Sequence, residues 1–147
     1  MTCDLRLASR EAKLGMPPAR LGLVYSHTGL RRFLDLVGPA HTRDLFFTAR
    51  TIGAELALAW GLVDEVVPAD ELAEHAVDYA ARIAANAPLS LRGNKRVMRV
   101  LEAASGALGE SDVRELVSLR DACFASRDFA EGVRAFAEKR PPRWTGT

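Results

Sequence analysis

Apolar residues recur at helical spacing over most of the chain after residue 25. One helix face is marked by residues at i, i+3, i+4 and i+7, namely Leu30, Phe33, Leu34 and Val37. Ser26 or Thr28 can cap the amino end of this helix, and Gly38 can end it in a left-handed conformation. Pro39 then suits the first turn of a second helix that runs to about residue 48. The pattern therefore predicts two helices that separate at Gly38.

The same spacing predicts three helices in the middle of the chain. A short one covers residues 54–60 and ends at Gly61, and a longer one covers residues 72–86. Pro88 can open the next helix. Its apolar residues are expected to face inward: Val97, Val100 and Leu101.

Two more helices are predicted toward the carboxyl end. Residues 104–111 contain two glycines and are expected to form a loop. The helix after this loop has an apolar face made of Val113, Leu116, Val117 and Phe124. Asp128 and Glu131 then match a D-x-x-E capping box, which predicts the start of a last helix that Pro141 and Pro142 stop.

Only two segments are predicted as convincing strands. Residues 4–8 alternate polar and apolar side chains, and residues 62–67 lie between Gly61 and Pro68. Two strands make a poor sheet, and the first begins directly after Met1. We therefore expect the chain to start inside a larger fold.

The composition is that of a soluble globular protein. Of 147 residues, 48% are hydrophobic and 27% charged, with 20 Lys and Arg against 19 Asp and Glu. This balance gives no net field for a polyanion, and the length suffices for a core without disulfides. Cys3 and Cys123 are too few for a disulfide scaffold, and no stretch reads as a signal peptide or membrane span. We expect a cytoplasmic protein that binds neither membrane nor nucleic acid.

The search for chemistry by residue type is mostly negative. The histidines at 27, 41 and 75 lack the spacing of metal ligands, and the glycines form no phosphate-binding loop. Neither a metal nor a nucleotide fold is therefore expected. A basic helical stripe is either a solvated face or a patch for a phosphorylated ligand or an acidic partner: Arg92, Lys95, Arg96 and Arg99.

The order of several motifs resembles one family of enzymes. They occupy residues 3–9, 12–17, 19–24, 38, 54–64, 67–72 and 131–140. Each motif alone is weak, but seven in this order resemble the enoyl-CoA hydratase/isomerase family, the crotonases. The resemblance extends from about residue 3 to residue 144.

The resemblance implies an α/β fold, a right-handed spiral of ββα turns followed by helices that pack into trimers. The chain resembles the C-terminal portion of this fold, a mostly α-helical part with two or three short strands. Residues 1–68 would form the last spiral turn with its helices, and residues 69–147 the trimerisation-type helical region, within one structural unit. A homo-oligomer, trimer or dimer of trimers, is implied.

The resemblance also implies a reaction class. Such lyases and isomerases of fatty acid metabolism take an acyl-CoA thioester as substrate, need no other cofactor, and stabilise an enolate with two backbone N–H groups. In the family these donors and a first glutamate precede the position of Met1, and a second glutamate matches Pro18. Proline cannot titrate, so the 147 residues alone are expected to be inactive as a hydratase. Hydration, isomerisation, decarboxylation and hydrolysis stay open, as does the acyl group.

Several site residues follow from the resemblance. Met16, Pro18 and Tyr25 are expected to line the substrate pocket, and Lys139 to meet a CoA phosphate. Tyr25 or His27 could donate a proton in place of the lost carboxylate, or could serve only as a packing aromatic and a helix-start residue. The alternative function is a non-catalytic helical module that associates with an intact crotonase subunit. In either case we expect exposed apolar patches.

Overall fold

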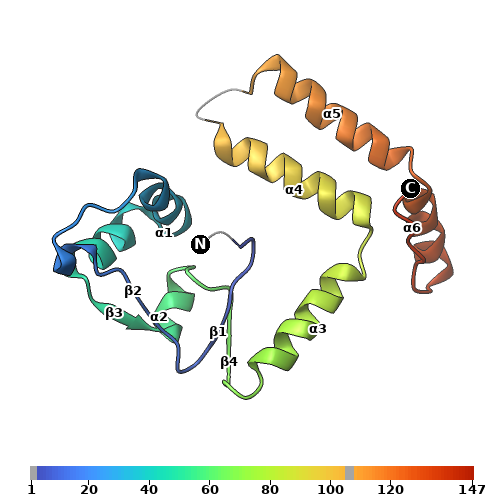
Figure 1. The fold of residues 1–147 in the computed structure, drawn as a ribbon. Coiled ribbons are helices and arrows are strands. Elements are labelled where there is room, and N and C mark those ends of the chain that lie inside the picture. The colour runs from blue at the N-terminus through green and yellow to red at the C-terminus, as the bar shows by residue number, and fades with distance from the viewer. Residues whose placement is uncertain (1–2, 105–107) are drawn as a thin grey trace. The chain divides into compact units, whose positions relative to one another are not determined.

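The computed structural model describes residues 3–104 and 108–147. The chain forms two compact units, Met1–Asp78 and Tyr79–Thr147, which we describe separately (Figure 1). The division near residue 68 that the family resemblance implies concerns spiral turns of a larger fold, and it stays a prediction.

Two small sheets build the first unit. Strand β1 (Leu7–Ser9) pairs in parallel with β4 (Glu65–Val67), and β2 (Lys13–Gly15) pairs antiparallel with β3 (Thr51–Gly53). Pairing of the amino-terminal strand with the segment before Pro68 confirms the two predicted strands, although β1 lies slightly downstream of residues 4–8. With β2 and β3 the described residues hold four strands, one more than the upper bound predicted. Strands β2 and β3 have only three residues each, which is too short for an alternation of polar and apolar residues to be recognised in the sequence.

The long helix α1 (His27–Thr48) is broken in the middle. Gly38 has φ 71° and ψ 174°, a backbone conformation that is open essentially to glycine alone, and Pro39 begins the second half. At the amino end the Ser26 hydroxyl accepts a hydrogen bond from the Gly29 N–H at 3.2 Å. The predicted pair of helices separated at Gly38 is therefore confirmed.

The core of the first unit is formed by residues of β1, of both halves of α1, and of the segment from β3 to β4. Helix η1 (Pro18–Leu21) and helix α2 (Ala54–Ala59) complete the unit. The core consists of Ala8, Phe33, Val37, Leu45, Phe46, Ile52, Ala57, Leu62 and Val63. Partly buried residues, among them Met16 and Tyr25, pack against this cluster.

Helices make up the second unit. Helix α3 (Leu72–Ala84) leads into it, followed by α4 (Pro88–Ala103), α5 (Glu110–Phe124) and α6 (Arg127–Glu138). Helices α4 and α5 lie side by side, and Arg96 forms a two-pronged ion pair with Glu115 at 2.6 and 2.7 Å. This ion pair lowers the pKa of Glu115 and raises that of Arg96. Part of the loop predicted over residues 104–111, namely 105–107, lies outside the described residues.

The predicted capping box of the last helix is wrong. Ser126 is the N-cap of α6, and its hydroxyl accepts from the Phe129 N–H at 3.0 Å. Asp128 and Glu131 instead bind the segment that follows the helix. Ser126, two residues before Asp128, caps the helix in its place, since serine is one of the preferred N-cap residues.

Large apolar side chains are exposed in both units, as predicted. Val24 is 94% exposed, Phe47 77% and Phe136 89%. Within α4, Val100 is buried but Leu101 is exposed, which corrects the expectation that both face inward. In the part of the chain that the structure describes, no helix is long and apolar enough to span a bilayer.

Candidate functional site

Four of the predicted site residues lie on one short segment of the first unit. Met16 directly follows β2, Pro18 is the first residue of η1, Tyr25 precedes α1, and His27 is the first residue of α1. Pro18 is buried, Met16 and Tyr25 are half-buried, and His27 is exposed. The segment therefore presents one aromatic hydroxyl and one imidazole beside an apolar wall.

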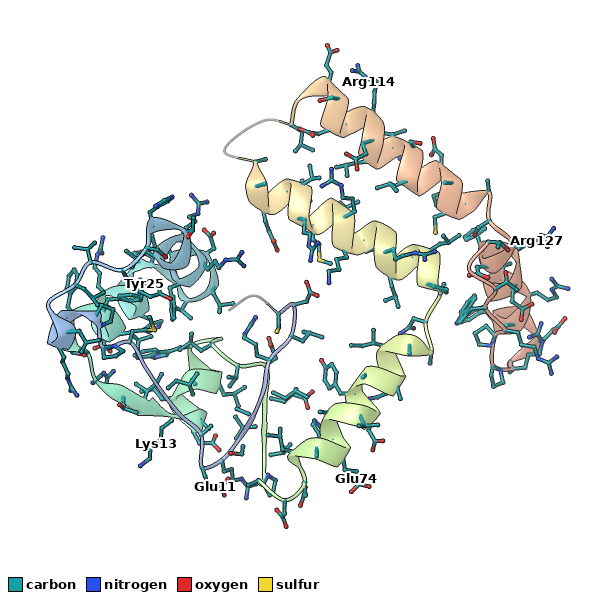
Figure 2. The ribbon with its side chains drawn as sticks, in the orientation of Figure 1. Glu11, Lys13, Tyr25, Glu74, Arg114 and Arg127 are labelled. Atoms are coloured by element: carbon teal, nitrogen blue, oxygen red, sulfur yellow. The ribbon has the colours of Figure 1, made fainter. Side chains whose placement is uncertain are left out.

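The ring of Tyr25 is held by an aromatic cluster. Its centroid lies 5.4 Å from that of Phe46, with a 55° tilt, and Phe46 meets Phe33 edge-on at 5.1 Å. Figure 2 labels Tyr25 beside the helices of the first unit. No hydrogen bond to its hydroxyl is present among residues 3–104 and 108–147. The phenol is therefore fixed at its ring and free at its oxygen.

The break at Gly38 explains this contact. A continuous helix over His27–Thr48 would be about 33 Å long. Tyr25 lies just before the start of this helix and Phe46 lies near its end, so the two residues could not then touch. The bend at Gly38 turns the second half of α1 back, so that Phe46 reaches Tyr25.

His27 and Pro18 offer less chemistry. No hydrogen bond or ring contact joins His27 to another residue within the described part of the chain. Pro18 has no titratable group, and its carbonyl accepts the N–H of Leu23 at 3.1 Å. It shapes the turn of η1, and Met16 adds apolar surface.

Lys139 lies in the second unit, at the end of α6. Its side chain is exposed, and its backbone is left-handed with φ 52° and ψ 41°. Glycine or asparagine is usual at such a position, because a Cβ there costs about 1–2 kcal/mol. Lys139 therefore ends α6 in a backbone conformation that is uncommon for a residue with a Cβ, as Ala49 does at the end of α1.

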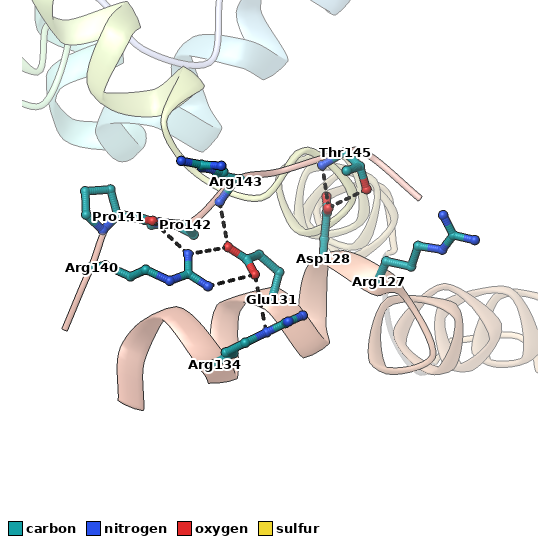
Figure 3. Close-up of a pocket in the computed structure, with 9 residues that line it drawn as sticks. All are labelled: Arg127, Asp128, Glu131, Arg134, Arg140, Pro141, Pro142, Arg143 and Thr145. Carbon is teal, nitrogen blue, oxygen red and sulfur yellow. Dashed lines mark hydrogen bonds and ion pairs between the residues drawn. The ribbon is translucent and has the colours of Figure 1, made fainter. Parts of the chain in front are cut away.

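Sequence reasoning missed a carboxylate cluster beside Lys139. A pocket of about 700 Å³ is lined by Arg127, Asp128, Glu131, Arg134, Arg140, Pro141, Pro142, Arg143 and Thr145 (Figure 3). Arg134 and Arg140 reach the Glu131 carboxylate from two sides, and the Arg143 N–H donates to it at 2.9 Å. Arg140 above all, and then the Arg143 N–H, lower the pKa of Glu131 to about 2.

Asp128 binds the end of the chain in the same way. Its carboxylate accepts the Thr145 N–H at 2.6 Å, the Thr145 hydroxyl at 3.0 Å and the Gly146 N–H at 2.9 Å. These bonds, led by the Thr145 N–H, lower the pKa of Asp128. The donors lie 17 and 18 residues further along the chain. No local sequence pattern could therefore have revealed them.

Trp144 fastens the same segment at a further point. Its Nε1–H donates to the Ala85 carbonyl at 2.6 Å. A Cβ at Gly132 would lie 3.2 Å from the indole, so the bare glycine allows this close packing. Residues 140–147, which we call the tail, are thus bound to α6 and to the end of α3.

The paired strands, the broken helix and the helical second unit agree with what comparison with known proteins finds. The profile of the Enoyl-CoA hydratase/isomerase family matches residues 1–147. The chain belongs to the enoyl-CoA hydratase/isomerase family. It spans about half the length of the curated relatives that it matches.

Three similar proteins illustrate the family. The methylmalonyl-CoA decarboxylase of Escherichia coli strain K12 is 33% identical over 99% of this chain and 56% of its own length. The crotonyl-CoA hydratase of Syntrophomonas wolfei is 37% identical over 95% of this chain and 53% of its own. The crystal structure of a family protein from Hyphomonas neptunium is 42% identical, covers 98% of this chain and 53% of its own, and superposes with a TM-score of 0.87.

The crotonase-like fold class predicted from the motifs is therefore confirmed. The assignments of Met16, Pro18, Tyr25, His27 and Lys139 to the site are not tested by these comparisons. They stay predictions.

Proposed function

We propose that this chain carries part of an acyl-CoA site in which a thioester enolate takes up a proton, without the two-glutamate addition of water. The proposal is supported by Pro18, which stands where the family resemblance implies a second glutamate, seven residues before Tyr25, whose hydroxyl has no hydrogen bond within the described residues. Addition of water across a double bond needs one group to take a proton and another to give it. Protonation of an enolate, in contrast, needs only a group that gives a proton.

Tyr25 suits this donor role better than His27. Buried Phe46 holds the Tyr25 ring, whereas His27 is exposed and has no described partner. In the proposed step the phenolic O–H bond breaks and a C–H bond forms at the α-carbon of the enolate. The phenolate then regains a proton from water, so the charge balances.

The remaining parts of the site are proposed from the family. Two backbone N–H groups would hold the thioester oxygen, and Lys139 would meet a CoA phosphate as a charge-assisted hydrogen-bond donor. The substrate is a CoA thioester, with no further cofactor. A homotrimer, a cytoplasmic location and a place in fatty acid metabolism belong to the same proposal. Relatives named as a decarboxylase and as a hydratase support the substrate class more than any one reaction.

Binding and turnover test the proposal separately. Titration calorimetry with butyryl-CoA, a saturated thioester that cannot be hydrated, is expected to show binding by the 147-residue chain. Hydration of crotonyl-CoA by the chain alone is expected to be absent, because Pro18 can neither take nor give a proton, and general acid–base help is worth about 10²–10⁴ in rate. Brisk hydration, or no affinity for the thioester, would overturn the proposal.

A second function is favoured by the exposed apolar side chains of the second unit. Phe124, Phe129, Val133 and Phe136 are each more than 40% exposed on α5 and α6. Such a face suits a non-catalytic helical module that associates with an intact crotonase subunit. Size-exclusion chromatography of the chain mixed with a full-length crotonase decides between the two. A stable mixed complex without thioester binding by this chain would favour the module.

A further inference from the structure

Among the described glycines, Gly29 leaves the least room for a Cβ, because the Tyr25 side chain lies in the way. A Cβ built on Gly29 would lie 2.3 Å from Cε1 of Tyr25 and 3.0 Å from its Cζ. Carbon atoms normally meet at about 3.5–4.0 Å. The Tyr25 ring therefore occupies space that any other residue at position 29 would fill.

The backbone at Gly29 does not explain the glycine. The residue lies in the first turn of α1 and does not have the left-handed φ that favours glycine. Alanine is preferred over glycine within helices. Packing is thus the physical reason that remains, and the nearest atoms are those of Tyr25 and the Ser26 hydroxyl.

We propose that Gly29 is a positioning residue, which lets the Tyr25 ring lie against the first turn of α1 and so fixes its hydroxyl for the reacting acyl group. This inference rests on the role proposed for Tyr25. Phe46 also packs against this ring, and Phe46 is itself buried and in edge-on contact with Phe33. The ring is in contact with both a helix turn and a buried aromatic, which restricts its direction, while its hydroxyl has no hydrogen bond within the described residues.

A small displacement of this ring is expected to matter. With alanine at position 29 the ring must retreat by about 1 Å to reach contact distance. A misplacement of this size can cost about 10²-fold in a reaction that depends on alignment. Gly29→Ala is therefore expected to impair the response of Tyr25 to a thioester.

The two tyrosines of the chain make this response measurable. Tyr79→Phe leaves Tyr25 as the only tyrosine, and the NMR signal of its ¹³C-labelled Cζ reports on the phenol. We expect this signal to shift when butyryl-CoA is added. Gly29→Ala in the same background is expected to move the signal of the free protein and to reduce the ligand-induced shift at a fixed thioester concentration.

Gly93→Ala is the matched control, because a Cβ on Gly93, within α4, would meet nothing within 4 Å. Gly93→Ala is expected to change neither the Tyr25 signal of the free protein nor its shift on addition of butyryl-CoA. An unchanged Tyr25 signal and thioester response in Gly29→Ala would overturn the inference. If butyryl-CoA does not bind at all, the proposed function fails, and the free-protein signal still decides whether Gly29 sets the position of Tyr25.

A double-mutant cycle separates Tyr25 from Ser26 as the reason for the glycine. Gly29→Ala is expected to lower the unfolding temperature of the native sequence. In a Tyr25→Ala background it is expected to raise that temperature, because the obstructing ring is gone and helix preference remains. Equal losses in both backgrounds would assign the effect to the Ser26 cap and refute a role through Tyr25.

Discussion

Arg140 and Glu131 form a two-pronged ion pair, with Nη1 2.7 Å from Oε1 and Nη2 3.1 Å from Oε2. Arg140 is the second residue after the end of α6 and Glu131 lies within that helix. The pair therefore fixes the direction in which the chain leaves the helix. With the Arg143 N–H on the same carboxylate, it holds the start of the tail against α6.

Acid is expected to release the tail. Glu131 has a native pKa of about 2 against an ordinary 4.5, and the pKa of Asp128 is also lowered. Groups whose pKa is depressed by folding stabilise the native state above their ordinary pKa, and this contribution is lost as the pH falls through that value toward the native one. Hydrogen exchange of the Arg143 and Thr145 amides is expected to lose protection as the pH falls from about 4.5 toward 2, after correction for intrinsic exchange.

Glu131→Gln tests the origin of this pH dependence. The variant is expected to lose protection at Arg143 already at neutral pH and to show a weaker acid response. Glu138→Gln is the matched control, because Glu138 also binds Arg140 but is half exposed and does not hold Arg143. Equal effects of both substitutions would contradict the role assigned to Glu131.

Gly38→Ala is expected to destabilise the first unit by about 1–3 kcal/mol, because φ 71° with ψ 174° is strained for any residue with a Cβ. No neighbouring atom lies within 4 Å of that Cβ, so the cost comes from the backbone alone. Urea unfolding measures it. Gly93→Ala, in an ordinary helical conformation, is expected to be neutral or stabilising, and a similar loss in both would refute the explanation.

The bend at Gly38 was predictable because its signals are local. A glycine followed by proline, after an apolar stripe that ends at Val37, is enough to predict the end of one helix and the start of another. The contact between Tyr25 and Phe46 was not predictable, because it depends on the angle of that bend. The family motifs identified the fold class from the same kind of local evidence.

Other features depend on partners far away in the sequence. Strands β2 and β3 have three residues each, and they are strands only because they pair with residues at least 36 positions apart in the sequence. Asp128 and Glu131 fitted the spacing of a cap, but the donors that they bind lie in the tail. Two acidic residues one helical turn apart give the same local pattern whether they cap the helix or bind the tail. Only the course of the tail decides which role they have.

Trp144→Phe is expected to loosen the tail and to cost about 1 kcal/mol, the net value of a typical hydrogen bond, because phenylalanine cannot donate to the Ala85 carbonyl. Faster exchange of the Gly146 amide, which donates to Asp128, would report the loosening. Trp60→Phe is the control, since Trp60 stacks on His41 in the first unit. Tail exchange unchanged by Trp144→Phe would show that Asp128 and Glu131 hold the tail unaided.

Lys139→Gly is expected to affect stability and ligand binding in opposite directions. Glycine relieves the left-handed backbone at φ 52° and should stabilise the second unit by about 1 kcal/mol. Loss of the ammonium should weaken butyryl-CoA binding about tenfold, the equivalent of about 1.4 kcal/mol for one charged hydrogen bond. Calorimetry at several salt concentrations should also show a smaller salt dependence.

Two further variants separate these effects of Lys139. Lys139→Ala removes the charge but keeps the Cβ, so it should weaken binding without a gain in stability. Lys13→Ala removes an equal charge from exposed strand β2 and should leave binding unchanged. If Lys139→Gly stabilises the chain while thioester affinity is retained, the lysine has no part in the site, and its left-handed conformation serves only to end α6.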